Sequence, residues 1–161
     1  MKILIVITMC SIFFACNSNT ADTKSNENSS IDSTTNAVTN VPFTLAKNYF
    51  VKNTFKQDSL TNPEITTQKD FDAVFGMAST MSADGKPTPI DFSMQHVLAV
   101  IQPVTDKATT LTVESLTQKE NNIVLNFSKA EGEKQSFSTR PYLLLIVDNK
   151  YNDKVKVQKV E

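Results

Sequence analysis

The chain has 161 residues, and its 16 Lys and Arg against 17 Asp and Glu give a formal net charge of −1. This balance argues against nucleic acid as a partner, because binding to phosphates needs clustered positive charge. The only cysteines are Cys10 and Cys16, so a domain formed by the later residues has neither a disulfide nor a thiolate nucleophile.

The N-terminal stretch carries the features of an export signal. Lys2 follows the start methionine, Ile3–Phe14 is almost entirely apolar, and Ala15 precedes Cys16. A positive start, a short apolar run and a small residue before the cleavage site are typical of a secretory signal peptide, whereas a membrane-spanning helix needs about 20 apolar residues. The Ala15-Cys16 pair resembles the lipobox of bacterial lipoproteins, which implies removal of residues 1–15 and lipidation of Cys16. Ordinary cleavage that leaves Cys16 as a free thiol is the alternative.

The next stretch differs sharply in composition. Asn, Ser, Thr and Asp dominate residues 17–40, and no aromatic residue occurs there. Such a segment buries too little apolar surface to offset the entropy of ordering. We therefore expect Cys16 and the residues up to 40 to form a disordered tether, with an end-to-end distance on the order of 25 Å. The folded domain is expected over residues 41–161.

One helix is expected in the first half of this domain. Thr67 is a typical N-cap residue, and Phe71, Val74 and Phe75 are spaced to form a single apolar stripe on a helix. Gly76 is a typical residue to end it.

The remaining pattern predicts strands. Continuous apolar runs indicate buried strands, strict alternation indicates half-buried ones, and lysines suit a last strand at a sheet edge. Six strands are expected, over Ala46–Phe55, Val97–Ile101, Leu111–Val113, Ile123–Phe127, Tyr142–Val147 and Val155–Val157. The third and fourth alternate in polarity and should form an antiparallel hairpin that turns at Lys119–Asn122. The expected fold is therefore α+β, with one helix in the N-terminal half packed on a curled, mainly antiparallel sheet of about six strands.

Residues that could carry catalysis are few. His96 is the only histidine, and although Ser93 and Asp91 are near in sequence, they form no recognisable triad motif. A metal site of His96 with Asp84 and Asp91 lacks the ligand spacing of known sites. We expect His96 to be a half-exposed residue at the start of a strand, and we expect no catalytic residue, no metal and no cofactor.

A partner-binding surface is the alternative use of the unusual residues. Met77, Met81 and Pro87 place apolar groups on a segment that a turn cannot bury fully, and methionine adapts to irregular surfaces. An equally good reading is that this segment folds back over the end of the helix and its methionines fill gaps in the core. Arg140 is the only arginine, and it stands with Tyr142 at the start of the most apolar strand. A rigid arginine is a common interface anchor, whereas an internal ion pair with a nearby acid, or internal hydrogen bonds to loop carbonyls, is an equally good reading of Arg140.

Three stretches in order resemble the PrcB-type C-terminal domain of bacterial envelope proteins. These are Thr67–Phe75 (TQKDFDAVF), Ile90–Ser93 leading into His96–Val100, and Arg140–Val147 (RPYLLLIV). The resemblance covers roughly 46–160. The family takes its name from a protein that is a partner subunit of a surface protease, so the resemblance implies protein binding rather than catalysis.

Together these observations favour a membrane-tethered, non-catalytic protein-binding lipoprotein of the bacterial cell envelope. Its lipid would anchor it in a membrane, with the outer membrane the expected one, and its partner would be an envelope protein that it stabilises or modulates, such as a protease. A lipoprotein that binds a small ligand or a carbohydrate on the concave side of the sheet is the alternative. A hydrolase with an unrecognised site is the third reading.

Overall fold

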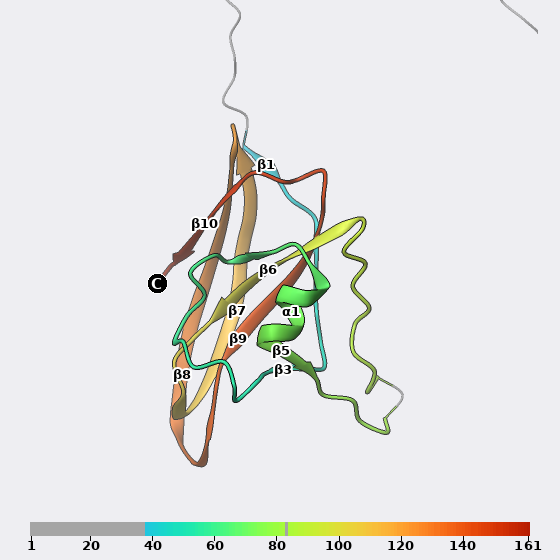
Figure 1. Ribbon diagram of the computed structural model, residues 1–161. Helices are drawn as coiled ribbons and strands as arrows, with labels where there is room; N and C mark the ends of the chain where they lie inside the picture. Colours follow the sequence, from blue (N-terminus) through green and yellow to red (C-terminus); the bar gives the residue numbers. More distant parts are fainter. Residues whose placement is uncertain (1–37, 83) are drawn as a thin grey trace, which may run out of the picture. The chain divides into compact units, whose positions relative to one another are not determined.

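The computed structural model describes residues 38–82 and 84–161, so the expected signal peptide, Cys16 and all but the last three residues of the expected tether lie outside the described residues. Within the described ranges the chain forms ten strands and one short helix (Figure 1). The elements are β1 (Thr39–Asn40), β2 (Phe43–Leu45), β3 (Tyr49–Val51), β4 (Glu64–Ile65), α1 (Gln68–Val74), β5 (Phe75–Met77), β6 (Gln95–Ile101), β7 (Thr105–Lys119), β8 (Asn122–Thr139), β9 (Tyr142–Asp148) and β10 (Lys154–Lys159).

The strands are arranged in three sheets. The long sheet has the order β1-β7-β8-β10, the central sheet β2-β9-β6-β4, and the small sheet pairs β3 with β5. Every pair is antiparallel except β8 and β10, which run parallel because the chain crosses from β9 in the central sheet to the edge of the long sheet. Figure 1 shows the long β7 and β8 ribbons on the left, and α1 with β3 and β5 in front of β9.

The central sheet is buried on both faces. Its strands β6 and β9 pair from Gln95↔Asp148 to Ile101↔Tyr142, and residues 97–101 and 143–147 are all buried. Strands that are covered on both sides need apolar residues at every position, which is why these two read as continuous apolar runs. The sequence prediction of both strands is confirmed.

Two separate core clusters cover these faces. Leu98 and Leu145 belong to a cluster shared with the long sheet, in which Ile123 and Leu125 are fully buried. On the opposite face, the side chains of Val97, Ala99, Ile101 and Leu144 pack against α1 and the small sheet. The second cluster is rich in aromatic residues, namely Tyr49, Phe71 and Phe75 together with the partly buried Phe55, Phe92 and Tyr142.

The expected α+β fold with one curled sheet is wrong. The described chain is mostly β, with sheets of four, four and two strands and a helix of seven residues. Because β6 and β9 present apolar side chains on both faces, the central sheet needs two covering layers, and one short helix supplies only part of one. The long sheet supplies the other layer.

The helix begins as expected but ends early. The Thr67 Oγ1 accepts a hydrogen bond from the Asp70 backbone N–H at 3.1 Å, which confirms the N-cap. The helix stops at Val74, not near Gly76, because Phe75 has an extended backbone (φ −111°, ψ 149°) and pairs with Val51 in the small sheet. The chain therefore passes directly from helix to strand without a glycine cap.

Several other strand boundaries differ from the expectation. The single strand expected over residues 46–55 is limited to β3, and Asn48 precedes it in a left-handed conformation with φ 62°. The β7–β8 hairpin is confirmed as antiparallel, although its strands are far longer than the expected ones. Lys154–Lys159 is confirmed as an edge strand.

Candidate functional site

Arg140 points inward and is held by the chain. Its Nη1 donates a hydrogen bond to the Phe55 carbonyl oxygen at 2.7 Å, and the guanidinium carbon lies 5.9 Å from the centre of the Phe55 ring. The Nη2 is 4.0 Å from an oxygen of Asp58, and only 16% of the side chain is exposed. These contacts fix the segment after β3 to the start of β9, so the structure favours the internal reading of Arg140 over the exposed anchor.

A small basic cavity lies beside Arg140. It has a volume of about 310 Å³, and Lys52 and Lys56 line it together with the hydroxyls of Ser138 and Thr139. The Lys52 ammonium already donates to the carbonyl oxygen of Asp72. The cavity therefore has a positive lining, in which the Arg140 Nη1 and the Lys52 ammonium already donate to backbone carbonyls, whereas the buried Arg140 Nε has no hydrogen-bond partner among the described residues.

Tyr142 belongs to a pair of internal tyrosines. Its hydroxyl donates to the Tyr49 carbonyl oxygen at 2.5 Å, and the Tyr49 hydroxyl donates to the Thr88 carbonyl oxygen at 2.7 Å. Burial raises the pKa of the Tyr142 hydroxyl, and burial followed by the negative charge of Asp72 raises the pKa of the Tyr49 hydroxyl. Both groups therefore stay protonated donors, and they connect β9 through β3 to the segment before Pro89.

Met77 and Met81 are exposed on one loop. We use the name methionine loop for residues 77–82 and 84–89, which follow β5 and lie at the lower right of Figure 1. Met81 is fully exposed, and 66% of Met77 is exposed. Pro87 and Met77 share the lining of a cavity of about 380 Å³ with Tyr49 and with Phe71 of α1.

The methionine loop is fixed although it is exposed. The Asn48 amide donates to the carbonyl oxygens of Asp84 at 2.6 Å and Lys86 at 2.8 Å, and the Asn48 carbonyl oxygen accepts from the Ala78 backbone N–H at 2.9 Å. Inside the loop, the Thr80 backbone N–H donates to the Gly85 carbonyl oxygen at 2.9 Å. One left-handed asparagine thus ties both ends of the loop to the body of the domain.

His96 is buried, not half-exposed as expected. Only 1% of it is exposed; its Nδ1 is 3.3 Å from Asn149 Oδ1, and its Nε2 is 3.9 Å from Glu64 Oε1. The Ser93 hydroxyl and the Ser93 backbone N–H both donate hydrogen bonds to the Asp91 carboxylate, at 2.6 and 3.0 Å. These two hydrogen bonds lower the pKa of the Asp91 carboxyl. Ser93 and Asp91 therefore bond to each other, while His96 faces Glu64 and Asn149.

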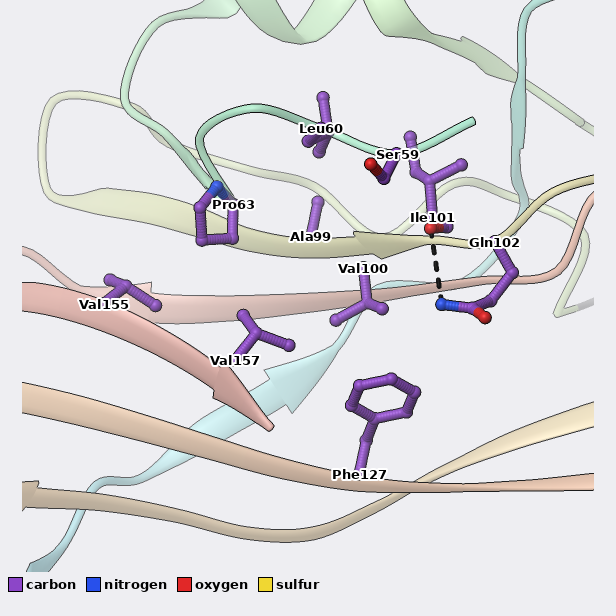
Figure 2. Close-up of a pocket in the computed structure, with 10 residues that line it drawn as sticks. All are labelled: Ser59, Leu60, Pro63, Ala99, Val100, Ile101, Gln102, Phe127, Val155 and Val157. Carbon is purple, nitrogen blue, oxygen red and sulfur yellow. Dashed lines mark hydrogen bonds between the residues drawn. The ribbon is translucent and has the colours of Figure 1, made fainter. Parts of the chain in front are cut away.

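A notch opens between the long and central sheets, and no sequence motif indicated it. We call it the inter-sheet notch; its volume is about 290 Å³ (Figure 2). Phe127 and Val157 point toward Val100 across the opening, and the side chain of Gln102 folds back so that its amide lies 3.4 Å from the Ile101 carbonyl oxygen. The lining consists of Ser59, Leu60, Pro63, Ala99, Val100, Ile101, Gln102, Phe127, Val155 and Val157.

In residues 38–82 and 84–161, no group of three or more His, Cys, Asp and Glu side chains is placed to hold a metal ion. No helix in this part of the chain has the length and apolar character needed to cross a membrane.

Comparison of the chain with protein-family models, with curated proteins and with solved structures finds no match. The resemblance to PrcB-type domains thus stays a prediction carried by its three sequence stretches. The arrangement of Met77, Met81, Pro87, Arg140 and Tyr142 is known from the structure: three lie on or beside an exposed loop, and two are internal.

Proposed function

We propose that this chain is a membrane-tethered, non-catalytic protein-binding lipoprotein of the bacterial cell envelope, and that the methionine loop is its binding surface. The observation that carries the proposal is the combination of full exposure at Met81 with a loop held by Asn48 at both ends. Apolar side chains that an anchored loop exposes to solvent are characteristic of binding surfaces.

The physical argument concerns entropy and shape. A flexible loop loses conformational freedom when it docks, and this loss opposes binding, whereas a loop already fixed by hydrogen bonds loses little. Methionine has an unbranched, polarizable side chain that fits irregular partner surfaces. Met77, which is 66% exposed where β5 passes into the loop, is a second apolar side chain on the same segment.

The tether supplies the location. Lipidation at Cys16 would hold the domain near a membrane, and the expected tether before β1, which begins at Thr39, would let the loop reach a partner anchored in the same envelope. The resemblance to a protease-complex subunit makes an envelope protease the first partner to test. Replacing Cys16 by Ser should abolish incorporation of a clickable fatty acid, and equal labelling of the variant would contradict the anchor.

The surface can be tested by site-specific photo-crosslinking in cells that produce the full chain. The photoreactive amino acid benzoylphenylalanine replaces Met81 in one variant and Phe137 in the control, because Phe137 is also large, apolar and 58% exposed but lies on β8. A discrete adduct of higher mass is expected at position 81 and not at position 137. Equal adducts at both positions would contradict a specific surface.

A third variant separates the shape of the loop from the methionine itself. A Cβ atom on Gly85 would overlap the Thr80 carbonyl oxygen, so Gly85→Ala must open the loop without changing Met81. None of the core residues comes from this loop, so the thermal midpoint should stay close to that of the unaltered chain. The adduct at position 81 should nevertheless fall several-fold; an unchanged adduct would show that fixation of the loop is irrelevant to binding.

A further inference from the structure

The open edge of β10 offers a second surface, independent of the methionine loop. β10 is the last strand of the long sheet, and among the strands of residues 38–82 and 84–161 it pairs only with β8. The backbone N–H groups of Lys154 and Val160 donate to Asn121 and Phe127 carbonyl oxygens of the β8 side, at 3.3 and 2.8 Å. Because backbone groups alternate in direction along a strand, the N–H and C=O groups of Val155, Val157 and Lys159 point away from β8.

These outward groups have no hydrogen-bond partner within residues 38–82 and 84–161. An edge of this kind is a template on which another extended chain can form a further strand. The side chains on β10 alternate as well, with Val155 and Val157 directed at the inter-sheet notch and Lys154 and Lys156 exposed on the opposite face.

The notch provides space for side chains of an added strand. Its volume of about 290 Å³ is close to twice the ~150 Å³ that accommodates one benzene molecule, so it holds about two apolar side chains. An added strand would project every second residue into this space, between Val157 of β10 and Pro63 before β4.

Charge selects the residues on the other face of that strand. Lys154 and Lys156 make no ion pair with any described residue, and β10 itself carries no acidic residue. Opposite charges on neighbouring strands attract and like charges repel. Lys154 and Lys156 should therefore oppose pairing between two copies of this edge. They should favour a strand with acidic residues on its exposed face.

We propose that β10 and the inter-sheet notch bind an extended segment of a partner protein in which apolar and acidic residues alternate. The segment adds a fifth strand to the long sheet at β10, places its apolar residues in the notch and sets its acidic residues beside Lys154 and Lys156.

Two capped synthetic peptides test the proposal with the full-length chain in detergent. The sequence EVEVEV has the proposed alternation, and KVKVKV is matched in length and apolar content but has the opposite charge. EVEVEV should bind at least tenfold more tightly, and its binding should weaken as salt is added. In NMR-detected amide exchange it should protect the N–H groups of Val155, Val157 and Lys159. Equal affinity for the two peptides, or no binding of either, would overturn the proposal.

Substitutions on β10 distinguish strand pairing from simple filling of the notch. Val157→Pro and Val157→Ala both remove the valine side chain from the notch, and neither removes a hydrogen bond to β8. Only proline also removes the outward backbone N–H of residue 157. Proline should weaken EVEVEV binding at least tenfold relative to alanine. Reversing both charges, with Lys154→Glu and Lys156→Glu, should switch the preference to KVKVKV.

A small apolar ligand is the competing occupant. Decanoate, which is apolar with one acidic end, should bind more weakly than EVEVEV and should leave the outward amides of β10 unprotected. If decanoate binds more tightly than the peptide and displaces it, the notch is a small-ligand pocket and the proposed strand addition is wrong.

Discussion

Replacing Phe75 by alanine tests the packing of the aromatic cluster between α1 and the central sheet. Phe75 is 1% exposed, its ring stacks on Phe71 at a centroid distance of 5.1 Å, and it lies 5.9 Å from the ring of Tyr142. Removing a buried phenylalanine ring costs about 3–5 kcal/mol. Because a domain of this size has a total stability of about 5–15 kcal/mol, the variant should be visibly unstable.

Urea unfolding followed by far-UV circular dichroism measures this loss, since the chain has no tryptophan to report on unfolding. With a slope of about 2 kcal/mol per molar urea, the midpoint should fall by about 2 M. Phe50→Ala is the matched control, because Phe50 is 46% exposed on the adjacent strand. It should cost less than about 1 kcal/mol. A loss below about 1 kcal/mol for Phe75→Ala, or equal losses for both variants, would refute the packing argument.

The remaining predictions concern a helix cap, a glycine and a carboxylate. Thr67→Ala should lower the free energy of unfolding by about 1 kcal/mol in urea, because it removes the N-cap acceptor; no change would contradict that role. Gly76→Ala should change it by less than about 1 kcal/mol, because the Phe50 ring that a Cβ would meet is exposed and can rotate away; a larger loss would show that this ring is fixed. Hydrogen bonds from two lysines lower the pKa of Glu131 from 4.5 to about 2. Its stabilising effect is therefore present above about pH 4.5 and is lost as the pH falls toward about 2. Glu131→Gln should flatten the fall in thermal midpoint over this range, and an unchanged slope would contradict it.

The parts of the fold that could be predicted from sequence are those in which one local signal dominates. The runs Val97–Ile101 and Tyr142–Val147 have no polar interruption, so only a buried strand accounts for them. Thr67 supplies an N-cap whose hydrogen bond spans three residues, and the β7–β8 turn joins two alternating segments that are neighbours in sequence. In each of these elements the contacts that decide the structure lie within, or immediately beside, the predicted segment.

The layers could not be predicted because they depend on pairings between distant residues. β1, β2 and β4 have two or three residues each, which is too short for an alternation pattern. Phe75 fits a helical apolar stripe as well as it fits a strand, and pairing with Val51 decides between them. A continuous apolar run also indicates burial on two faces, and a sheet buried on two faces needs two covering layers, which one curled sheet with a single helix does not supply.

In the candidate sites, too, local features could be predicted from the sequence, whereas contacts between distant residues could not. For Met77 and Met81 the sequence favours exposure and a place in the core equally, and the structure exposes both side chains. The fixation of their loop comes from Asn48, 36 and 38 residues away from its two acceptors. For Arg140 the same reasoning favoured an anchor and an internal contact equally. A residue that starts a core strand lies close to the chain around it, and the carbonyl oxygen of Phe55, 85 residues away, takes one of its donors. The contacts that hold the Arg140 guanidinium in place also remove it from the surface, whereas the loop around Met81 is held through backbone groups of neighbouring residues and the Met81 side chain stays fully exposed.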